Sequence, residues 1–403
     1  MEKIRLGIIG IGNMGSSHAK KVVQGRCPDF VLTAVADINP QRHQWVREDL
    51  GQDIACFEDA EEMLDSGLID ACIVSVPHYD HCKYAIACMQ RGIHVMVEKP
   101  AGVYTKQVRE MNAEAAKHPE VVFGMMFNQR TNHIYRKIME LIDSGKYGNI
   151  RRTNWIITNW YRPQAYYDSG AWRATWAGEG GGVLLNQCPH QLDLWQWLCG
   201  MPVKVQAHLH YGKWHDIEVE DDVTTYVEYA NGATGVFVTT TGDGWGTNRL
   251  EIQLDKAKIV AEKEKLELWE FDVSEPEFTR TNKKSFGAIN ATLTLPETDG
   301  ENPQHVGVLN AWGGAILRGE SMVAQGTEGI NGLTLSNAMH LSSWLGRAVE
   351  LPFDEELYHR ELMKRVATSR IKENVHSVVE DTDGSYGGST PTGEDKKSWN
   401  TNW

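Results

Sequence analysis

Short apolar segments alternate with segments of helical periodicity over the first 128 residues. Runs that are apolar throughout predict buried strands, and the amphipathic stretches between them predict helices. Strands of this kind, joined by helices, form a parallel sheet covered on both faces, so we expect a doubly wound α/β domain over residues 1–128. The expected strands are Ile4–Ile9, Phe30–Ala36, Ile69–Val76, Ile93–Val97 and Val121–Phe127, and the expected helices are Met14–Gln24, Pro40–Leu50, His81–Arg91 and Lys106–Lys117.

The pattern changes in residues 129–375, where longer segments are rich in β-branched and aromatic residues. Turn signals such as Asn231-Gly232 separate some of them, as in antiparallel hairpins. We therefore expect a second, α+β domain with an open, mostly antiparallel sheet. Its expected strands are Thr153–Trp160, Lys204–Tyr211, Val219–Tyr229, Thr234–Thr241, Leu250–Leu254 and Lys258–Glu262, and Ala311–Arg318 and Gly329–Val349 are expected to be helical. Residues 376–403 are polar and rich in Gly, Ser and Thr, which predicts a surface arm or tail.

Composition narrows the classes of partner. Lys and Arg number 40 and Asp and Glu 54, a net charge of −14, and no basic block occurs, so we expect neither nucleic acid nor an anionic membrane surface as a partner. The seven cysteines are scattered without a Cys-x-x-Cys, which favours reduced thiols in a cytoplasmic protein. One exposed face of an open sheet is usually covered by a second subunit, which predicts a homo-oligomer, a dimer or a tetramer.

Glycines at Gly10, Gly12 and Gly15 form a GxGxxG pattern between a strand and a helix. The first glycine permits a tight turn, the second lets the backbone approach a pyrophosphate, and the third lets helix and strand pack closely. The N–H groups and dipole of the helix start attract phosphates. We therefore predict a Rossmann-type dinucleotide site, and the residues between the glycines, Ile11, Asn13 and Met14, belong to it.

Asp37 ends the second strand, about 20 residues after the glycine turn. Its carboxylate can accept hydrogen bonds from both hydroxyls of the adenine ribose and would repel a 2′-phosphate, so NAD is favoured over NADP. A glycine turn followed by a solvated aspartate is the alternative.

Further candidates follow later strands of the same sheet, because ligands of open parallel sheets lie beyond the carboxyl ends of the strands. A loop after the third strand and one residue after the fifth should flank the cofactor, although a proline-terminated strand end without function would look the same. The residues concerned are Ser75, Val76, Pro77, His78, His81 and Asn128.

Glu98-Lys99-Pro100 follows the fourth strand and therefore points to the same crevice. A lysine there can hydrogen-bond a substrate hydroxyl and stabilise negative charge that develops on oxygen. Pro100 restricts the backbone, through a cis peptide if the turn requires one. A surface ion pair is the alternative for Glu98 and Lys99.

GIIGIGNMG, Asp37, VEKP and a Gly-rich segment leading to His190-x-x-Asp193 together resemble the Gfo/Idh/MocA oxidoreductases. The resemblance implies a Rossmann domain followed by an open-sheet α/β domain, NAD or NADP as cofactor, and a sugar or cyclic polyol as substrate. It also implies that Lys99 is the lysine of the family's EKP motif and that His190 is its catalytic histidine.

The second catalytic segment is GEGGGVLLNQCPHQLDLWQWLCG, from Gly178 to Gly200. If it is helical, Asn186, His190 and Asp193 share a face. Pro189 disfavours an uninterrupted helix, so we expect a kink or a helix start near Cys188-Pro189. Asp193 could support the imidazole of His190 or could be a structural acid.

Alcohol oxidation needs a base for the hydroxyl proton. His190 can be that base near neutral pH, with Lys99 bonded to the same hydroxyl, or the two roles can be reversed. Many relatives carry Asp where this chain has Asn186, and an asparagine can orient the histidine only by hydrogen bonding. A strict Asp–His pair is therefore not expected here.

Aromatic residues are concentrated between Trp155 and Trp197. Tyr161, Trp172 and Arg173 are candidates to bind a sugar by stacking and by hydrogen bonding to hydroxyls, whereas core and interface packing is the alternative. His208, His210 and His215 lack the spacing of a metal site and are expected on a strand surface, so no metal is predicted.

Three functions remain open. The first is an NAD-dependent dehydrogenase acting on a secondary hydroxyl of a sugar, glycoside or inositol. The second is a glycosidase that holds NAD, oxidises C3 transiently and eliminates the aglycone. The third is a non-catalytic protein that senses NAD or a sugar on the same fold.

Overall fold

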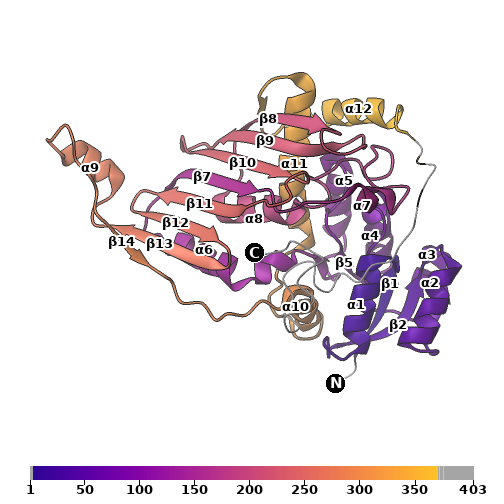
Figure 1. Ribbon diagram of the computed structural model, residues 1–403. Coiled ribbons are helices and arrows are strands. Elements are labelled where there is room, and N and C mark those ends of the chain that lie inside the picture. Colours follow the sequence, from indigo (N-terminus) through magenta and orange to yellow (C-terminus); the bar gives the residue numbers. More distant parts are fainter. Residues whose placement is uncertain (1–2, 371, 373–374, 376–403) are drawn as a thin grey trace.

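Two β-sheets organise the chain in the computed structural model, which describes residues 3–370, 372 and 375 (Figure 1). The first is six-stranded and parallel, and the second is nine-stranded and mixed. The expected polar arm at 376–403 lies outside the described residues. No helix within them is both long enough and apolar enough to cross a membrane.

The first sheet has the order β3-β2-β1-β4-β5-β6, with every neighbouring pair parallel. This confirms the predicted doubly wound domain, because the strand order reverses between β1 and β4. The strands are β1 Ile4–Ile9, β2 Phe30–Ala36, β3 Ala55–Phe57, β4 Ala71–Val74, β5 His94–Val97 and β6 Phe123–Met125.

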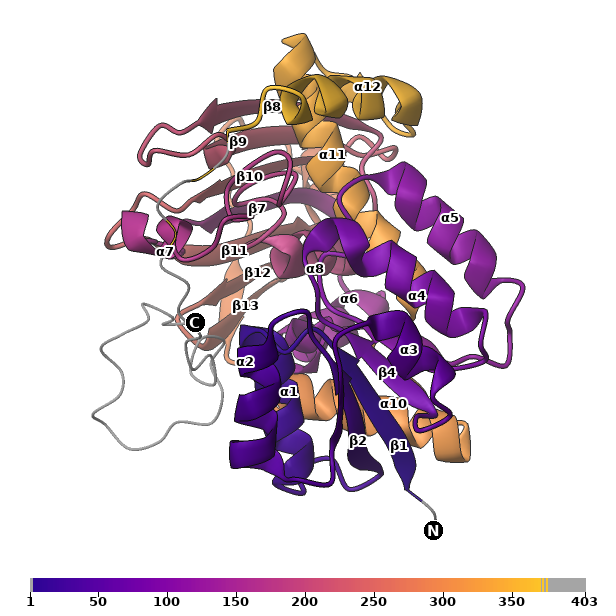
Figure 2. The same ribbon diagram turned by 90° about the vertical axis from the view of Figure 1, so that its right-hand side faces the viewer.

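Helices cover both faces of this sheet (Figure 2). One face packs against α1 and, from far along the chain, against α10, where Trp312 stacks on Phe30. The other face packs against α3, α4 and α5. The helices are α1 Asn13–Val23, α2 Pro40–Trp45 continued by the π-helical turn Val46–Leu50, α3 Ala60–Asp65, α4 His81–Met89, α5 Thr105–Ala115 and α10 Gln304–Arg318.

Pattern reading missed β3 and α3. The three residues of β3 are only half-buried, so they give no continuous apolar run. The expected strands Ile69–Val76 and Val121–Phe127 were too long at both ends, because the apolar residues outside β4 and β6 lie in loops. Two 3-10 turns follow these strands, His78–Asp80 and Asn128–Thr131.

The second sheet has the order β14-β13-β12-β11-β7-β10-β9-β8-β15. All neighbours are antiparallel except β7 and β10, which confirms the expected mostly antiparallel sheet. The strands are β7 Ile150–Ile157, β8 Lys204–Tyr211, β9 Glu220–Glu228, β10 Thr234–Thr240, β11 Asn248–Leu254, β12 Ala257–Glu262, β13 Lys265–Phe271, β14 Ala291–Thr294 and β15 Val349–Glu350.

One face of the second sheet is buried and the other is open. Trp155 and Ile157 of β7 are fully buried, whereas Ile156 between them is 40% exposed, as strand alternation requires. The buried face packs against α6, α8 and α11. The homo-oligomer expected to cover the open face stays a prediction. The remaining helices are α6 His133–Asp143, α7 Gln164–Asp168, α8 Pro189–Cys199, α9 Glu275–Thr281, α11 Gly329–Leu345 and α12 Glu355–Val366, with a 3-10 turn at Gly326–Glu328.

Two expected helices differ in length from the observed ones. The helix expected from Ala311 starts seven residues earlier, at Gln304, and the helix expected to reach Val349 ends at Leu345. Gly346 follows it with a φ of 63°, the left-handed conformation that favours glycine at a helix end. The segment with α9 and β14, which extends from the edge of the second sheet in Figure 1, was not expected.

A buried ion pair joins the turn after β6 to α8. The guanidinium of Arg130 donates to both carboxylate oxygens of Asp193, at 2.6 and 2.8 Å, and to Glu328 at 2.6 Å. The side chains of Arg130 and Asp193 are 2% and 1% exposed. Asp193 is therefore a structural acid, the second of the two roles considered for it.

We predict that Arg130→Met lowers the free energy of unfolding by about 3–5 kcal/mol, because it leaves the Asp193 carboxylate buried without its cation. Urea unfolding measures this effect. The control is Arg136→Met, which breaks the exposed pair Arg136–Asp299 and should cost less than about 1 kcal/mol. Equal losses in both variants would contradict the prediction.

Candidate active site

The glycine turn between β1 and α1 has the shape of a phosphate cradle. Gly10 has a φ of +88°, and a Cβ there would lie 2.4 Å from the carbonyl oxygen of Ser75. A Cβ at Gly15 would lie 1.9 Å from the carbonyl oxygen of Gly10. A Cβ at Gly12, the N-cap of α1, would meet nothing within 4 Å, so the space beside this backbone is open. Asn13 and Met14 begin the helix, and the turn fits a pyrophosphate.

Asp37 lies at the end of β2 and braces this turn. Its two carboxylate oxygens accept the N–H groups of Ile11 and Asn39, at 2.7 and 2.8 Å. The other lone pairs can still accept hydroxyl groups. Arg42 donates to the carbonyl oxygen of Ile11 and to Ser16 Oγ, both at 2.6 Å, which adds a cation to the same turn.

The loop after β4 contacts the second domain. The N–H of Ser75 donates to the carbonyl oxygen of Ile9 in β1. Val76 is half-buried, and Pro77 is exposed. Nδ1 of His78 lies 3.3 Å from the carbonyl oxygen of Glu179, and its ring centroid is 5.6 Å from that of Trp172. His78 therefore lies where the two domains meet.

His81 has a different environment. Its ring nitrogens lie 2.6 Å from the carbonyl oxygen of Pro100 and 2.8 Å from that of Val76. It thereby ties the loop after β4 to the turn after β5, which favours a structural role. The Lys99–Pro100 peptide in that turn is cis.

Glu98 and Asn128 are both engaged within the protein. Glu98 is buried, and one carboxylate oxygen lies 2.6 Å from Nε2 of His18 on α1. Although burial raises the pKa of Glu98, the hydrogen bond and charge of His18 outweigh it and lower the pKa to about 2. The amide of Asn128 donates to the side chain of Gln304. Both residues thus hold the crevice in shape.

Lys99 reaches the second domain. Its Nζ donates to the main-chain carbonyl oxygen of Asn186 at 2.9 Å. Helix α8 starts with Cys188 as N-cap and Pro189 as its first residue, the helix start considered as one alternative. Asn186 consequently precedes the helix, so the helix face that it would share with His190 in a continuous helix does not form. Proline is favoured as the first helical residue because the N–H group at that position has no acceptor within the helix, so no hydrogen bond is lost when proline lacks it.

His190 follows at the second position of α8 and is 1% exposed. Its ring lies edge-on to Phe127, with centroids 6.4 Å apart. Burial and the nearby positive charge of Lys99 hold the pKa of His190 well below 6.5. The predicted acid–base residues thus come from different domains and influence each other electrostatically.

A polar network extends from Asn186 toward the aromatic residues. The hydroxyl of Tyr166 donates to Oδ1 of Asn186 at 3.4 Å and accepts Nη1 of Arg173 at 3.0 Å. The Arg173 guanidinium lies 4.7 Å from the centroid of Trp172 and 4.6 Å from that of Tyr166. Tyr161 is 45% exposed, and its part in the site stays a prediction.

Glu179 was missed by sequence reasoning. Its carboxylate accepts the Asn186 side-chain amide, and it is 2% exposed. The sequence did contain a signal for it. If the glycines of GEGGG pack closely against other backbone, the glutamate between them is expected to be buried as well.

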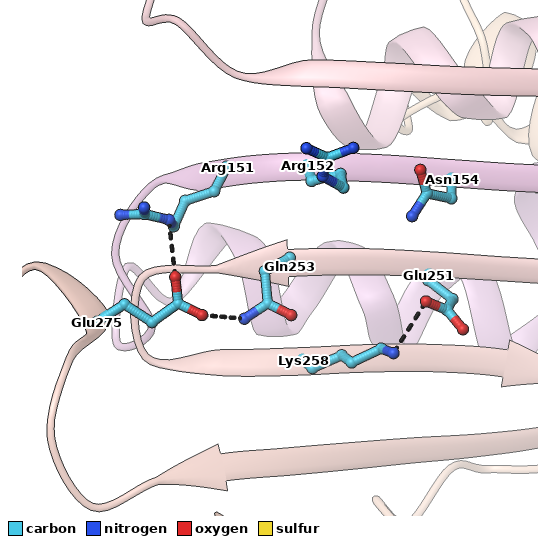
Figure 3. Close-up of a pocket in the computed structure, with 7 residues that line it drawn as sticks. All are labelled: Arg151, Arg152, Asn154, Glu251, Gln253, Lys258 and Glu275. Atoms are coloured by element: carbon cyan, nitrogen blue, oxygen red, sulfur yellow. Dashed lines mark hydrogen bonds and ion pairs between the residues drawn. The ribbon is translucent and has the colours of Figure 1, made fainter. Parts of the chain in front are cut away.

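A cavity lies elsewhere, on the open face of the second sheet (Figure 3). It has a volume of about 450 Å³. Two ion pairs lie among its charged side chains, Lys258 with Glu251 at 2.9 Å and Arg151 with Glu275 at 3.0 Å. No residue of the predicted active site lines it. Beside Pro100 and Pro189 the seam between the domains is apolar and holds only about 10 Å³ of free volume.

The expected surface histidines are confirmed on β8, where His208 and His210 are exposed. His215 instead pairs with Asp221, at 3.0 Å. Within the part of the chain that the structure describes, no three His, Cys, Asp or Glu side chains gather as metal ligands.

The glycine turn between β1 and α1 and the contact of Lys99 with the second domain indicate the class, an NAD-binding oxidoreductase. Comparison with known families agrees. Residues 4–125 match the model described as "Oxidoreductase family, NAD-binding Rossmann fold", and residues 135–260 match the "GFO/IDH/MocA C-terminal domain". The chain therefore belongs to the Gfo/Idh/MocA family of oxidoreductases, as its motifs indicated.

Relatives extend over most of the chain. Myo-inositol 2-dehydrogenase of Thermotoga maritima is 25% identical over 64% of this chain and 75% of its own length. The NADP-dependent scyllo-inositol 2-dehydrogenase IolW of Bacillus subtilis is 25% identical over 87% of this chain and 97% of its own. The WlbA dehydrogenase of Chromobacterium violaceum, solved with NADH and UDP-GlcNAcA, has a TM-score of 0.75, with 28% identity over 88% of this chain and 97% of that one.

We predict that Asp37→Asn narrows the preference for NAD over NADP. Asparagine still accepts the N–H of Ile11 but carries no charge to repel a 2′-phosphate, so the ratio of the two dissociation constants should change by about tenfold or more. Fluorescence titration with NADH and NADPH measures it. Asp59→Asn at the N-cap of α3 is the matched control and should leave the ratio unchanged. The ribose role of Asp37 is contradicted if its variant also leaves the ratio unchanged.

Proposed function

We propose that this protein is an NAD-dependent dehydrogenase that oxidises a secondary hydroxyl of a sugar, glycoside or inositol, with Lys99 and His190 as its acid–base pair. The observation that carries the proposal is the hydrogen bond from Lys99 Nζ to Asn186 at 2.9 Å. It links the end of β5, beside the glycine turn, to the loop that leads into His190.

The burial of His190 supports its role as the base. Bound nicotinamide supplies the acceptor for the hydride that leaves the substrate carbon. The proton of the hydroxyl needs a neutral acceptor, and a lowered pKa keeps the His190 imidazole neutral at physiological pH. Lys99 donates a hydrogen bond to the same oxygen and stabilises the negative charge that develops on it.

The neighbouring side chains suit a polyhydroxylated substrate. Trp172 offers an aromatic face, and Arg173 and Asn186 offer hydrogen-bonding groups within one connected network. The preference for NAD rests on the Asp37 carboxylate at the end of β2. The relatives that are inositol dehydrogenases, and WlbA with its UDP-sugar, act on or bind this chemical class of molecule.

We predict that Lys99→Ala reduces the rate of NADH formation by roughly 100-fold or more, because the variant loses a donor to the reacting oxygen, while NADH still binds. A panel of sugars, glycosides and inositols, followed at the NADH absorbance band, measures turnover. Lys106→Ala, at an exposed ion pair with Glu356, is the control and should retain full activity.

The same panel separates the competing functions. NADH that accumulates in step with substrate oxidation supports the dehydrogenase. Sugar release without net NADH formation supports the NAD-holding glycosidase instead. Turnover of nothing in the panel favours a sensing protein.

We also predict a pH profile for oxidation in which kcat/KM stays level well below pH 6.5. A histidine whose folded pKa is lowered loses its proton at a lower pH, so His190 remains a competent base where an ordinary imidazole is already protonated. An acid limb with its midpoint above pH 6.5 would argue against His190 as the base.

A further inference from the structure

The carboxylate of Glu179 is a buried acid beside the lysine–histidine site. One oxygen accepts the side-chain N–H of Asn186, and the other accepts the main-chain N–H of Ala174 at 2.5 Å. Its own carbonyl oxygen faces His78 of the first domain. A carboxylate with 2% exposure is costly to bury, so these contacts must be structurally specific.

The partner Ala174 has an unusual backbone. Its φ is 52°, in the left-handed region that an alanine rarely adopts. The hydrogen bond from the Ala174 N–H to Glu179 stabilises this conformation. Ala174 directly follows Trp172 and Arg173 in the chain. The carboxylate therefore also shapes the segment that presents these two candidate substrate residues.

The other partner, Asn186, connects Glu179 to the lysine. The side chain of Asn186 is bonded to Glu179, and its main-chain carbonyl oxygen receives Lys99 Nζ. Glu179 thus holds the side chain of Asn186, while the backbone of Asn186 orients the amine of Lys99. Moving Asn186 moves the acceptor of Lys99.

We propose that Glu179 is a positioning residue of this active site, which fixes Asn186 and through it the place of the Lys99 ammonium group. The proposal rests on the dehydrogenase function argued above, and extends it to a residue that touches neither substrate nor cofactor.

The hydrogen bond between residues 179 and 186 can be exchanged in direction, with the donor at position 179 and the acceptor at position 186. At present a carboxylate at position 179 accepts from two donors, the Ala174 N–H and the Asn186 amide. In Glu179→Gln, the single amide oxygen can accept from only one of these two donors, and the new NH₂ group faces the other donor without an acceptor between them. Asn186→Asp instead sets two carboxyl groups against each other. In the double variant, the glutamine at position 179 accepts from Ala174 and donates to the aspartate at position 186, so every group again has a partner.

Other charged groups face Glu179 and must be kept constant. Burial raises the pKa of Glu179, the positive charge of Arg173 lowers it, and the nearby carboxylate of Glu220 raises it. Glu179 in turn raises the pKa of Lys372, which burial lowers. Tyr167 also feels its charge. Both the wild type and the double variant carry one carboxylate at the 179–186 pair, so the total charge seen by these groups is the same.

The experiment measures kcat and KM for the best substrate of the panel in wild type, both single variants and the double variant. We expect each single variant to lose roughly 10- to 100-fold in kcat, since misplacing a reacting group by about 1 Å costs this much. The double variant should regain most of the kcat that either single variant loses, whereas its KM should change, because the side chain at position 186 also belongs to the network proposed to bind the substrate. NADH affinity should stay within about twofold throughout, because the cradle is untouched.

The matched control is Glu218→Gln. Glu218 also binds a main-chain N–H of the same segment, that of Trp176 at 3.1 Å, and Ser369 at 2.6 Å, but contacts neither Asn186 nor Lys99. Its kcat should stay at the wild-type value. Thermal melting shows which variants fold, and if Glu179→Gln does not, the comparison of Asn186→Asp with the double variant decides.

A second measurement does not depend on turnover. The rate at which trinitrobenzenesulfonate labels Lys99 in the protein without cofactor, read by peptide mass spectrometry against Lys106, reports how firmly the amine is held. It should rise in Glu179→Gln and return in the double variant. A single variant with wild-type kcat and labelling, or a double variant no better than the singles, overturns the role of Glu179. A wild type that oxidises nothing overturns the proposed function instead, and the labelling rates then decide about Glu179 alone.

Discussion

The hydrogen bond between Lys99 and the carbonyl oxygen of Asn186 is the contact on which the site depends, because it joins a residue of the first domain to one of the second. Each side of the contact is anchored by buried charges. On the first side, Glu98 next to Lys99 is paired with His18 of α1. On the second side, Asp193 of α8 is paired with Arg130. A buried charge without its partner is strongly unfavourable, so these pairs restrict where β5 and α8 can lie.

The same principle organises the Gly-rich segment between the domains. Glu220 accepts the N–H groups of Gly182 and Leu184 and pairs with His340 of α11. Glu179 does the equivalent for Ala174 and Asn186. The glycines allow this backbone to approach closely, as at Gly182, where a Cβ would lie 2.0 Å from a main-chain oxygen. Carboxylates thus hold the backbone of this loop through its N–H groups.

Much of the fold could be predicted from local patterns. β1, β2 and β8 have the expected bounds, since their apolar or alternating residues coincide with the whole strand. The motif residues of the first domain also lie where strand ends predict, because every parallel strand directs its carboxyl end to one edge. The domain boundaries at residues 128 and 375 stay predictions. The strand β3 and the segment carrying α9 and β14 were missed, since half-buried or exposed residues leave no periodic signal. The strand β13 and the helices α6 and α12 were also not expected.

By itself, the sequence determined the glycine turn, the acid after β2 and the lysine after β5, and it limited α8 to a kink or a start near Pro189, because each follows from backbone geometry within a few residues. Only the tertiary structure decided which partner each charged side chain takes. It assigned Asp193 to Arg130, Glu98 to His18 and Glu179 to Asn186, pairs separated by 63, 80 and 7 residues. Such pairing depends on which elements pack together, and hydrophobic periodicity carries no information about the identity of a buried ion's counter-charge.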